Sequence, residues 1–140
     1  MTAIQPLFSE LEPMPKASAD APIGIFDSGI GGMSVAAEIA KYLPNEHIVY
    51  YADTAYVPYG PRSDEEIREL TARAVDWLYR QGCKIAVVAC NTASAKALRT
   101  IQQNDLEKMG KGKRVLGVHK RLPKRRKPET VGRLNRLGVP

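Results

Sequence analysis

The sequence has little cysteine, and its apolar residues never gather into long runs. Only Cys83 and Cys90 are present among 140 residues, which argues against a disulfide framework and fits free thiols in a reducing cytoplasm. No apolar run approaches the roughly 20 residues that cross a bilayer, so we expect no membrane-spanning segment. The start of the chain also lacks the basic residues and apolar block of a secretory signal. These absences favour a cytoplasmic protein.

Basic and acidic residues nearly balance until the last part of the chain. Residues 1–118 hold 13 Lys and Arg against 14 Asp and Glu, whereas residues 119–140 hold 8 against one. We therefore predict a flexible extension over 1–21, an α/β domain over 22–118 and a basic tail over 119–140. The tail has no aromatic residue to stack on bases and no useful apolar periodicity. We interpret it as a frameshift product, and the alternative is a natural basic tail for RNA or anionic surfaces.

Segments with strand and helix patterns alternate between residues 22 and 118. Short apolar or β-branched runs bounded by turn signals predict strands at 22–27, 47–53, 85–89 and 114–118. One helix is predicted over 34–43, where apolar residues recur at helical spacing. This alternation is typical of an open, mainly parallel sheet flanked by helices, and it places the chain in the α/β class.

Two further helices are predicted between these strands. Ser63 and Glu66 form a capping box that starts one of them, and Gly82 is the type of residue that stops it. Its apolar face comprises Ile67, Leu70, Ala74, Trp77 and Leu78. The other helix follows Cys90 and runs through Ile101.

Polar loops follow three of the predicted strands. They read "DSGIGG", "DTAYVPYG" and "CNTAS". The carboxyl ends of parallel strands meet at one edge of an open sheet, which is where ligands bind. We therefore predict a site made of Asp27, Ser28, Tyr59, Gly60, Cys90, Asn91 and Thr92.

Cys90 is predicted to be the more reactive of the two thiols. A thiol between a strand end and a helix N-terminus has its pKa lowered from about 8.5, and its thiolate acts as a nucleophile or a base. Ser28, Asn91 and Thr92 offer donors for a carboxylate or phosphate, and Asp27 offers a carboxylate for a substrate amine or a proton. Alternatively, Cys90 is an inert buried thiol and Asp27 a helix cap. We interpret Cys83, before its strand, as an inert core residue.

Three long strings, in this order, resemble glutamate racemase of the Asp/Glu racemase family: "GIFDSGIGGMSV", "YYADTAYVPYG" and "VVACNTASA". The resemblance implies cofactor-independent interconversion of L- and D-glutamate, which supplies D-glutamate for peptidoglycan. It also implies two similar α/β domains, with the active site and two opposed cysteines between them. Neither a metal nor a cofactor is expected.

By position, Cys90 resembles the acid/base of the first domain, and Asp27 resembles a residue that binds substrate and assists the thiol. Substrate-binding positions are matched by Asp27, Ser28, Tyr59, Gly60, Asn91 and Thr92. The extension is similar to segments that help family members to bind an activating cell-wall precursor.

The sequence departs from the family in lacking a second cysteine in a "GCTH" motif. Cys83 cannot replace it, because Cys83 and Cys90 lie at opposite ends of one strand, about 20 Å apart. We therefore predict an N-terminal fragment that is inactive alone. A small-carboxylate binding module, an aspartate racemase and nucleic-acid binding through the tail stay open as alternatives, and so does homo-oligomerisation.

Overall fold

The computed structural model describes residues 17–118, so most of the predicted extension and all of the predicted basic tail lie outside the described residues. Within this range strands alternate with helices, as the sequence predicts. The elements follow in the order β1 (Ile23–Asp27), α1 (Met33–Tyr42), β2 (Ile48–Ala52), η1 (Thr54–Tyr56), α2 (Asp64–Arg80), β3 (Ile85–Val88), α3 (Asn91–Lys96), α4 (Leu98–Thr100), η2 (Ile101–Asp105), α5 (Leu106–Met109) and β4 (Val115–Gly117).

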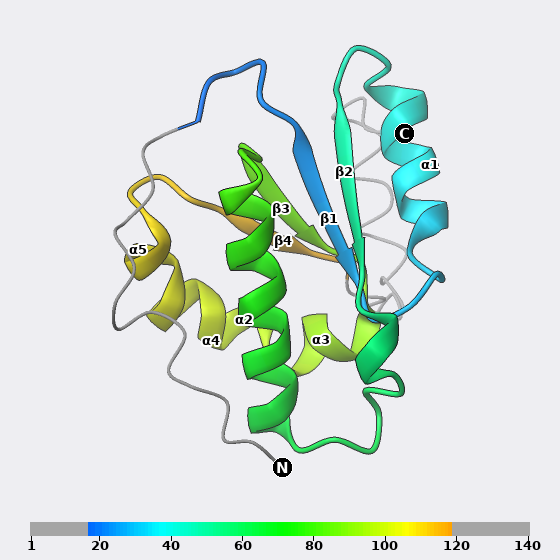
Figure 1. The fold of residues 1–140 in the computed structure, drawn as a ribbon, viewed down its shortest axis with the longest axis vertical. Coiled ribbons are helices and arrows are strands. Elements are labelled where there is room, and N and C mark those ends of the chain that lie inside the picture. Colours follow the sequence, from blue (N-terminus) through cyan, green and yellow to red (C-terminus); the bar gives the residue numbers. More distant parts are fainter. Residues whose placement is uncertain (1–16, 119–140) are drawn as a thin grey trace, which may run out of the picture.

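The described strands form one sheet in the order β2-β1-β3-β4, and all of their pairings are parallel. Phe26 of β1 pairs with Tyr51 on one side and with Val88 on the other. The chain winds outward from β1 to β2 and then in the opposite direction through β3 and β4. All strand arrows in Figure 1 point toward the end of the sheet where α3 lies. The prediction of an α/β fold with a parallel sheet is confirmed.

Helices pack on both faces of this sheet (Figure 1). Side chains alternate between the two faces along each strand, so Phe26 packs in one apolar cluster and its neighbour Ile25 in another. Residues of α2 and α3 complete the cluster around Phe26. Residues of α1 pack, half-buried, against the cluster around Ile25. All of β1 is buried, which fixes the central strand and the loop that follows it.

Helix α2 begins and ends at the predicted residues. The Ser63 hydroxyl accepts the Glu66 N–H at 3.2 Å, and the Glu66 carboxylate accepts the Ser63 N–H at 3.1 Å. Gly82 follows the helix with a φ of 88°, a conformation that favours glycine. Four of the five predicted apolar residues are buried, but Trp77 is 40 % exposed. Its ring lies against Tyr51 of the edge strand β2, so it covers the rim of the core.

The segment after Cys90 is less regular than predicted. A continuous helix through Ile101 is wrong, because α3 ends at Lys96 and Ala97 has a φ of −117°. A wider helical turn, η2, follows the short α4. Ala97 and Ile101 are nevertheless buried in the Phe26 cluster. The apolar spacing therefore predicted which residues face the core, but not the breaks between the helical pieces.

Candidate functional site

The candidate site lies at the carboxyl end of the sheet, where the winding direction reverses between β1 and β3. Such a reversal separates the loops that follow the two strands and opens a crevice for a ligand. Asp27 ends β1, and Cys90 comes two residues after the end of β3. The Ala89 N–H donates to the Phe26 carbonyl at 2.7 Å, which keeps the two strand ends in register. This pairing brings Ser28 next to Cys90.

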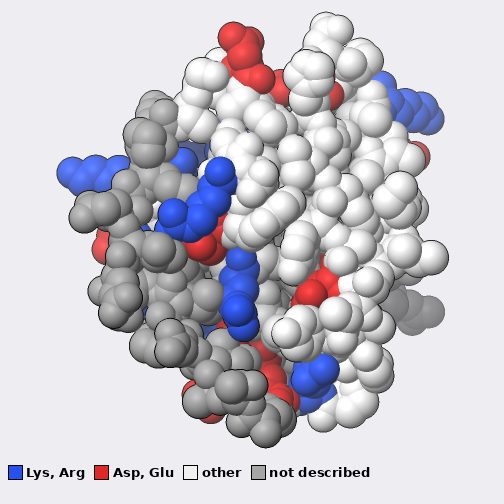
Figure 2. Space-filling view, viewed as in Figure 1, with Lys and Arg blue, Asp and Glu red and all other residues white. Residues whose placement is uncertain are grey.

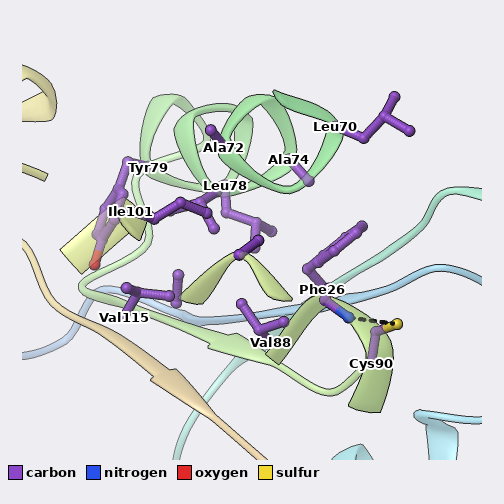
Figure 3. Packing of buried hydrophobic residues seen from close by; sticks show 14 of the residues in the cluster. Phe26, Leu70, Ala72, Ala74, Leu78, Tyr79, Val88, Cys90, Ile101 and Val115 are labelled. Atoms are coloured by element: carbon purple, nitrogen blue, oxygen red, sulfur yellow. Dashed lines mark hydrogen bonds between the residues drawn. The ribbon is translucent and has the colours of Figure 1, made fainter. Parts of the chain in front are cut away.

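The Cys90 side chain is held by two neighbours at this strand end. Its sulfur accepts the Ala93 N–H at 3.4 Å, so the thiol caps α3 (Figure 3). The thiol also lies 3.4 Å from the Ser28 hydroxyl oxygen, to which it donates. Cys90 is 6 % exposed and sits at the end of the core cluster, beside Phe26 and Val88. The thiol is therefore packed against the core from one side and flanked by polar donors at the sheet edge.

Asp27 is buried and held through one of its two carboxylate oxygens. Oδ2 accepts the Gly32 N–H at 2.8 Å and the Tyr50 hydroxyl at 3.4 Å. Neither bond uses Oδ1, and a carboxylate accepts hydrogen bonds at both oxygens. The backbone fits tightly here, since a Cβ on Gly32 would come within 2.9 Å of the Cβ atoms of Ala89 and Asp27. The carboxylate is thus fixed in orientation with one oxygen left for a ligand.

Tyr50 also belongs to this arrangement, although it is not among the residues predicted from the sequence. Its hydroxyl bridges Asp27 and the Gly29 carbonyl, at 3.4 and 3.3 Å. Burial and the nearby Asp27 carboxylate raise the pKa of Tyr50 to about 12. A strand alternates its faces, so β2 sends Tyr50 toward the α1 side and Tyr51 toward the α2 side. That alternation was the signal in the sequence that could have separated the two tyrosines.

Tyr59 occupies a different environment from the other predicted residues. Its ring is buried beside Phe26, and its hydroxyl donates to Asp53 Oδ2 at 2.5 Å. Burial and the Asp53 carboxylate raise the pKa of Tyr59. Asp53 in turn donates its N–H to the Asp27 carbonyl at 2.9 Å. The Tyr59 side chain thus anchors the loop after β2 to β1, and the adjoining Gly60 is exposed.

Asn91 and Thr92 form the first turn of α3, directly after Cys90. Asn91 is exposed and Thr92 is half-buried. The fold therefore brings Asp27, Ser28, Cys90, Asn91 and Thr92 to one edge, and it ties the Tyr59–Gly60 loop to the same edge through Asp53. Cys83 lies at the other end of β3, fully buried, and burial raises the pKa of its thiol. Only one of the two thiols belongs to the candidate site.

Residues 17–118 were also compared with the patterns of a metal site, a membrane span and a nucleic-acid surface. No cluster of three or more His, Cys, Asp or Glu side chains there could hold a metal ion. None of the helices in that range is both long and apolar enough to cross a membrane. Among the described residues on the face shown in Figure 2, positive and negative side chains are interspersed.

Comparison with known proteins gives consistent matches. No protein-family model matches the chain. It is 58 % identical over 92 residues to the glutamate racemase of Deinococcus radiodurans, covering 66 % of this chain and 31 % of that protein. Glutamate racemase from Francisella tularensis in complex with D-glutamate is similar in structure, with a TM-score of 0.62 and 38 % identity over 70 % of this chain and 35 % of that one. Escherichia coli glutamate racemase in complex with L-glutamate and the activator UDP-MurNAc-Ala has a TM-score of 0.59 and 37 % identity, over 70 % and 35 % of the two chains. The chain thus spans about a third of the length of these proteins.

Proposed function

We propose that this chain, which is 58 % identical over 92 residues to a glutamate racemase and spans about a third of the length of that protein, forms half of a glutamate racemase active site. The reaction is the cofactor-independent interconversion of L- and D-glutamate. The main support is the position of the Cys90 thiol at the strand end, in contact with Ser28, the residue that follows Asp27.

In the proposed reaction, the Cys90 thiolate removes the proton from the α-carbon of glutamate and becomes a thiol. The electron pair left on the α-carbon is delocalised into the substrate carboxylate, which makes that carbon planar. A second acid on the opposite face then delivers a proton and inverts the centre. The Ala93 N–H, and the Ser28 hydroxyl turned toward the sulfur, are the donors that stabilise the thiolate. The second acid has to come from outside this chain, since Cys83 is buried at the other end of β3.

The substrate is held in this proposal by the groups around the thiol. Asp27 Oδ1 accepts the substrate ammonium, because Oδ2 is already bound to Gly32 and Tyr50. Asn91 and Thr92 donate to a substrate carboxylate from the first turn of α3. Since the Tyr59 hydroxyl is bound to Asp53, the Tyr59–Gly60 pair contributes through backbone groups. Holding both the ammonium and the carboxylate that flank the α-carbon would fix the face that Cys90 attacks.

We place this activity in the cytoplasm, where free thiols are stable, and assign its product, D-glutamate, to peptidoglycan synthesis. The E. coli relative binds an activator named UDP-MurNAc-Ala. That complex supports regulation of the complete enzyme by a cell-wall precursor of the same kind.

A chimera tests the proposal directly. Residues 22–118 of this chain replace the matching segment of the D. radiodurans racemase, and racemisation is followed by circular dichroism from either enantiomer. We expect activity in both directions. Removing a general base typically costs about 10²- to 10⁴-fold in rate, so Cys90→Ala in the chimera should lose at least that much, whereas the matched control Cys83→Ala should remain active. A folded Cys90→Ala chimera with full activity would refute the assignment.

The 140-residue chain alone is expected to bind glutamate at most, without racemising it. One thiol can remove a proton but cannot return it to the other face. Sustained turnover by the repurified chain from either enantiomer would contradict the single-base half-site.

A further inference from the structure

Two buried carboxylates follow neighbouring strands at the carboxyl end of the sheet, and they are bound differently. Asp27 ends β1 and Asp53 comes directly after β2, and their exposed fractions are 6 % and 5 %. Phenols occupy both oxygens of Asp53, since Oδ1 accepts the Tyr51 hydroxyl at 3.4 Å and Oδ2 accepts the Tyr59 hydroxyl at 2.5 Å. Asp27 instead accepts both of its bonds on Oδ2. Asp53 therefore serves the fold, whereas Asp27 keeps one oxygen for a ligand.

The direction in which that oxygen points depends on hydrogen bonds. The last torsion angle of an aspartate has a broad, two-fold preference, so its carboxylate turns easily unless neighbours hold it. The Gly32 N–H holds Oδ2 at 2.8 Å, and the Tyr50 hydroxyl reaches the same oxygen at 3.4 Å. The Tyr50 ring is half-buried against the apolar cluster around Ile25, which fixes its hydroxyl. Two donors from different elements, the turn before α1 and the strand β2, thus set the orientation of Asp27.

Tyr50 also contacts the loop that follows Asp27. Its hydroxyl oxygen lies 3.3 Å from the Gly29 carbonyl oxygen, and its one hydrogen is shared between this carbonyl and the carboxylate. The residue before Gly29 is Ser28, whose hydroxyl oxygen lies 3.4 Å from the Cys90 sulfur. A single phenol therefore holds the short segment that carries both Asp27 and Ser28.

We propose that Tyr50 is a positioning residue of the racemase half-site, whose hydroxyl holds the Asp27 carboxylate so that Oδ1 meets the ammonium of the substrate. This inference rests on the proposed function and adds to it a residue that acts through Asp27. Without the hydroxyl, Asp27 stays charged but is free to turn. Binding of the substrate ammonium then weakens, while the groups that bind the substrate carboxylate stay in place.

The chimera that carries residues 22–118 in the D. radiodurans racemase provides the test, because its active site is complete. Tyr50→Phe keeps the ring and removes only the hydroxyl. The KM for glutamate should rise about tenfold, as expected for the loss of one long hydrogen bond to a charged group. The kcat should change little, because the ammonium is bound alike in the ground state and the transition state. A merely structural role would instead lower the fraction of folded enzyme, which reduces the apparent kcat and leaves KM unchanged.

Glutarate separates the positioning of Asp27 from a general loosening of the site. It carries both carboxylates of glutamate but has no ammonium. Its inhibition constant should therefore be the same for the unsubstituted chimera and for Tyr50→Phe, although the KM for glutamate differs between them. Equal weakening of glutamate and glutarate, or an unchanged KM for glutamate, would overturn the proposal.

Tyr51→Phe is the matched control, because it removes a phenol hydroxyl from the next residue of β2, on the opposite face, where the partner is Asp53. It should leave the KM for glutamate unchanged. In an Asp27→Asn background, Tyr50→Phe should raise KM no further, since the carboxylate that Tyr50 positions is already gone. Additive effects of these two substitutions would contradict action through Asp27.

The same variants distinguish failure of this inference from failure of the proposed function. An unsubstituted chimera that binds glutamate without racemising it would contradict the proposed function. The dissociation constants of glutamate and glutarate, measured by calorimetry, would then test Tyr50 by the same comparison. A folded chimera that binds no glutamate would overturn both.

Discussion

Replacing Gly32 by alanine should damage the candidate site far more than the same change at its neighbour Gly31. A Cβ on Gly32 would lie 2.9 Å from the Cβ atoms of Asp27 and Ala89 and 3.0 Å from the Tyr50 hydroxyl oxygen. Two of these three neighbours are Cβ atoms, attached directly to the backbone at or just after the ends of β1 and β3, and they cannot move aside by a rotamer change. A Cβ on Gly31 would meet only Asp27 Oδ2, at 3.9 Å, which is an ordinary contact.

The expected cost follows from two contributions. Forcing an extra carbon into a packed site costs about 1–3 kcal/mol. If the loop moves to relieve the clash, the Gly32 N–H also leaves the Asp27 carboxylate, and a hydrogen bond to a charged group is worth about 1.5–3 kcal/mol. Both alanine variants gain about 0.4–1 kcal/mol from a less flexible unfolded chain, so this gain cancels between them. We therefore expect Gly32→Ala to be less stable than Gly31→Ala by about 2–4 kcal/mol.

Urea unfolding followed by the fluorescence of Trp77, the single tryptophan, measures this difference. Thiol labelling of Cys90 in the folded state gives a second readout, because the displaced loop also carries Ser28. Labelling should change in Gly32→Ala and stay as in the unsubstituted chain in Gly31→Ala. Equal stabilities of the two variants would show that the close approach at Gly32 does not constrain the loop.

Two further predictions concern the thiols and Tyr50. Cys90 should react with iodoacetamide before Cys83, because Cys83 is fully buried and burial raises the pKa of its thiol. Peptide mass spectrometry measures the labelling rate of each thiol. Earlier labelling of Cys83 in the folded chain would count against the site. Tyr50 should titrate in the folded chain with a pKa near 12, seen as phenolate absorbance, and Asp27→Asn should lower that value. The raised pKa means that the contribution of Tyr50 to stability is complete below its usual pKa of 10.0 and is lost as the pH rises toward 12. An unchanged titration in Asp27→Asn would remove the Asp27 carboxylate as a cause.

The sequence alone determined the order of the elements and the edge at which the candidate site forms. Local patterns carry this information, since strand runs, a capping box at Ser63 and a glycine stop at Gly82 each act within a few residues. Parallel strands then bring Asp27 and Cys90 to one edge whatever the details of packing.

Tertiary structure decided what each side chain touches at that edge. The strand order places Ser28 within hydrogen-bond distance of Cys90. Because side chains alternate between the two faces of β2, Tyr50 lies on the face where its hydroxyl reaches Asp27. Tyr59 went into the core with Asp53, a partner that no local pattern indicated. Lys84 likewise meets Ala19 and Glu46, two residues far from it in the chain, only after folding. Such contacts depend on distances between elements, and one-dimensional spacing fixes faces and ends but not those distances.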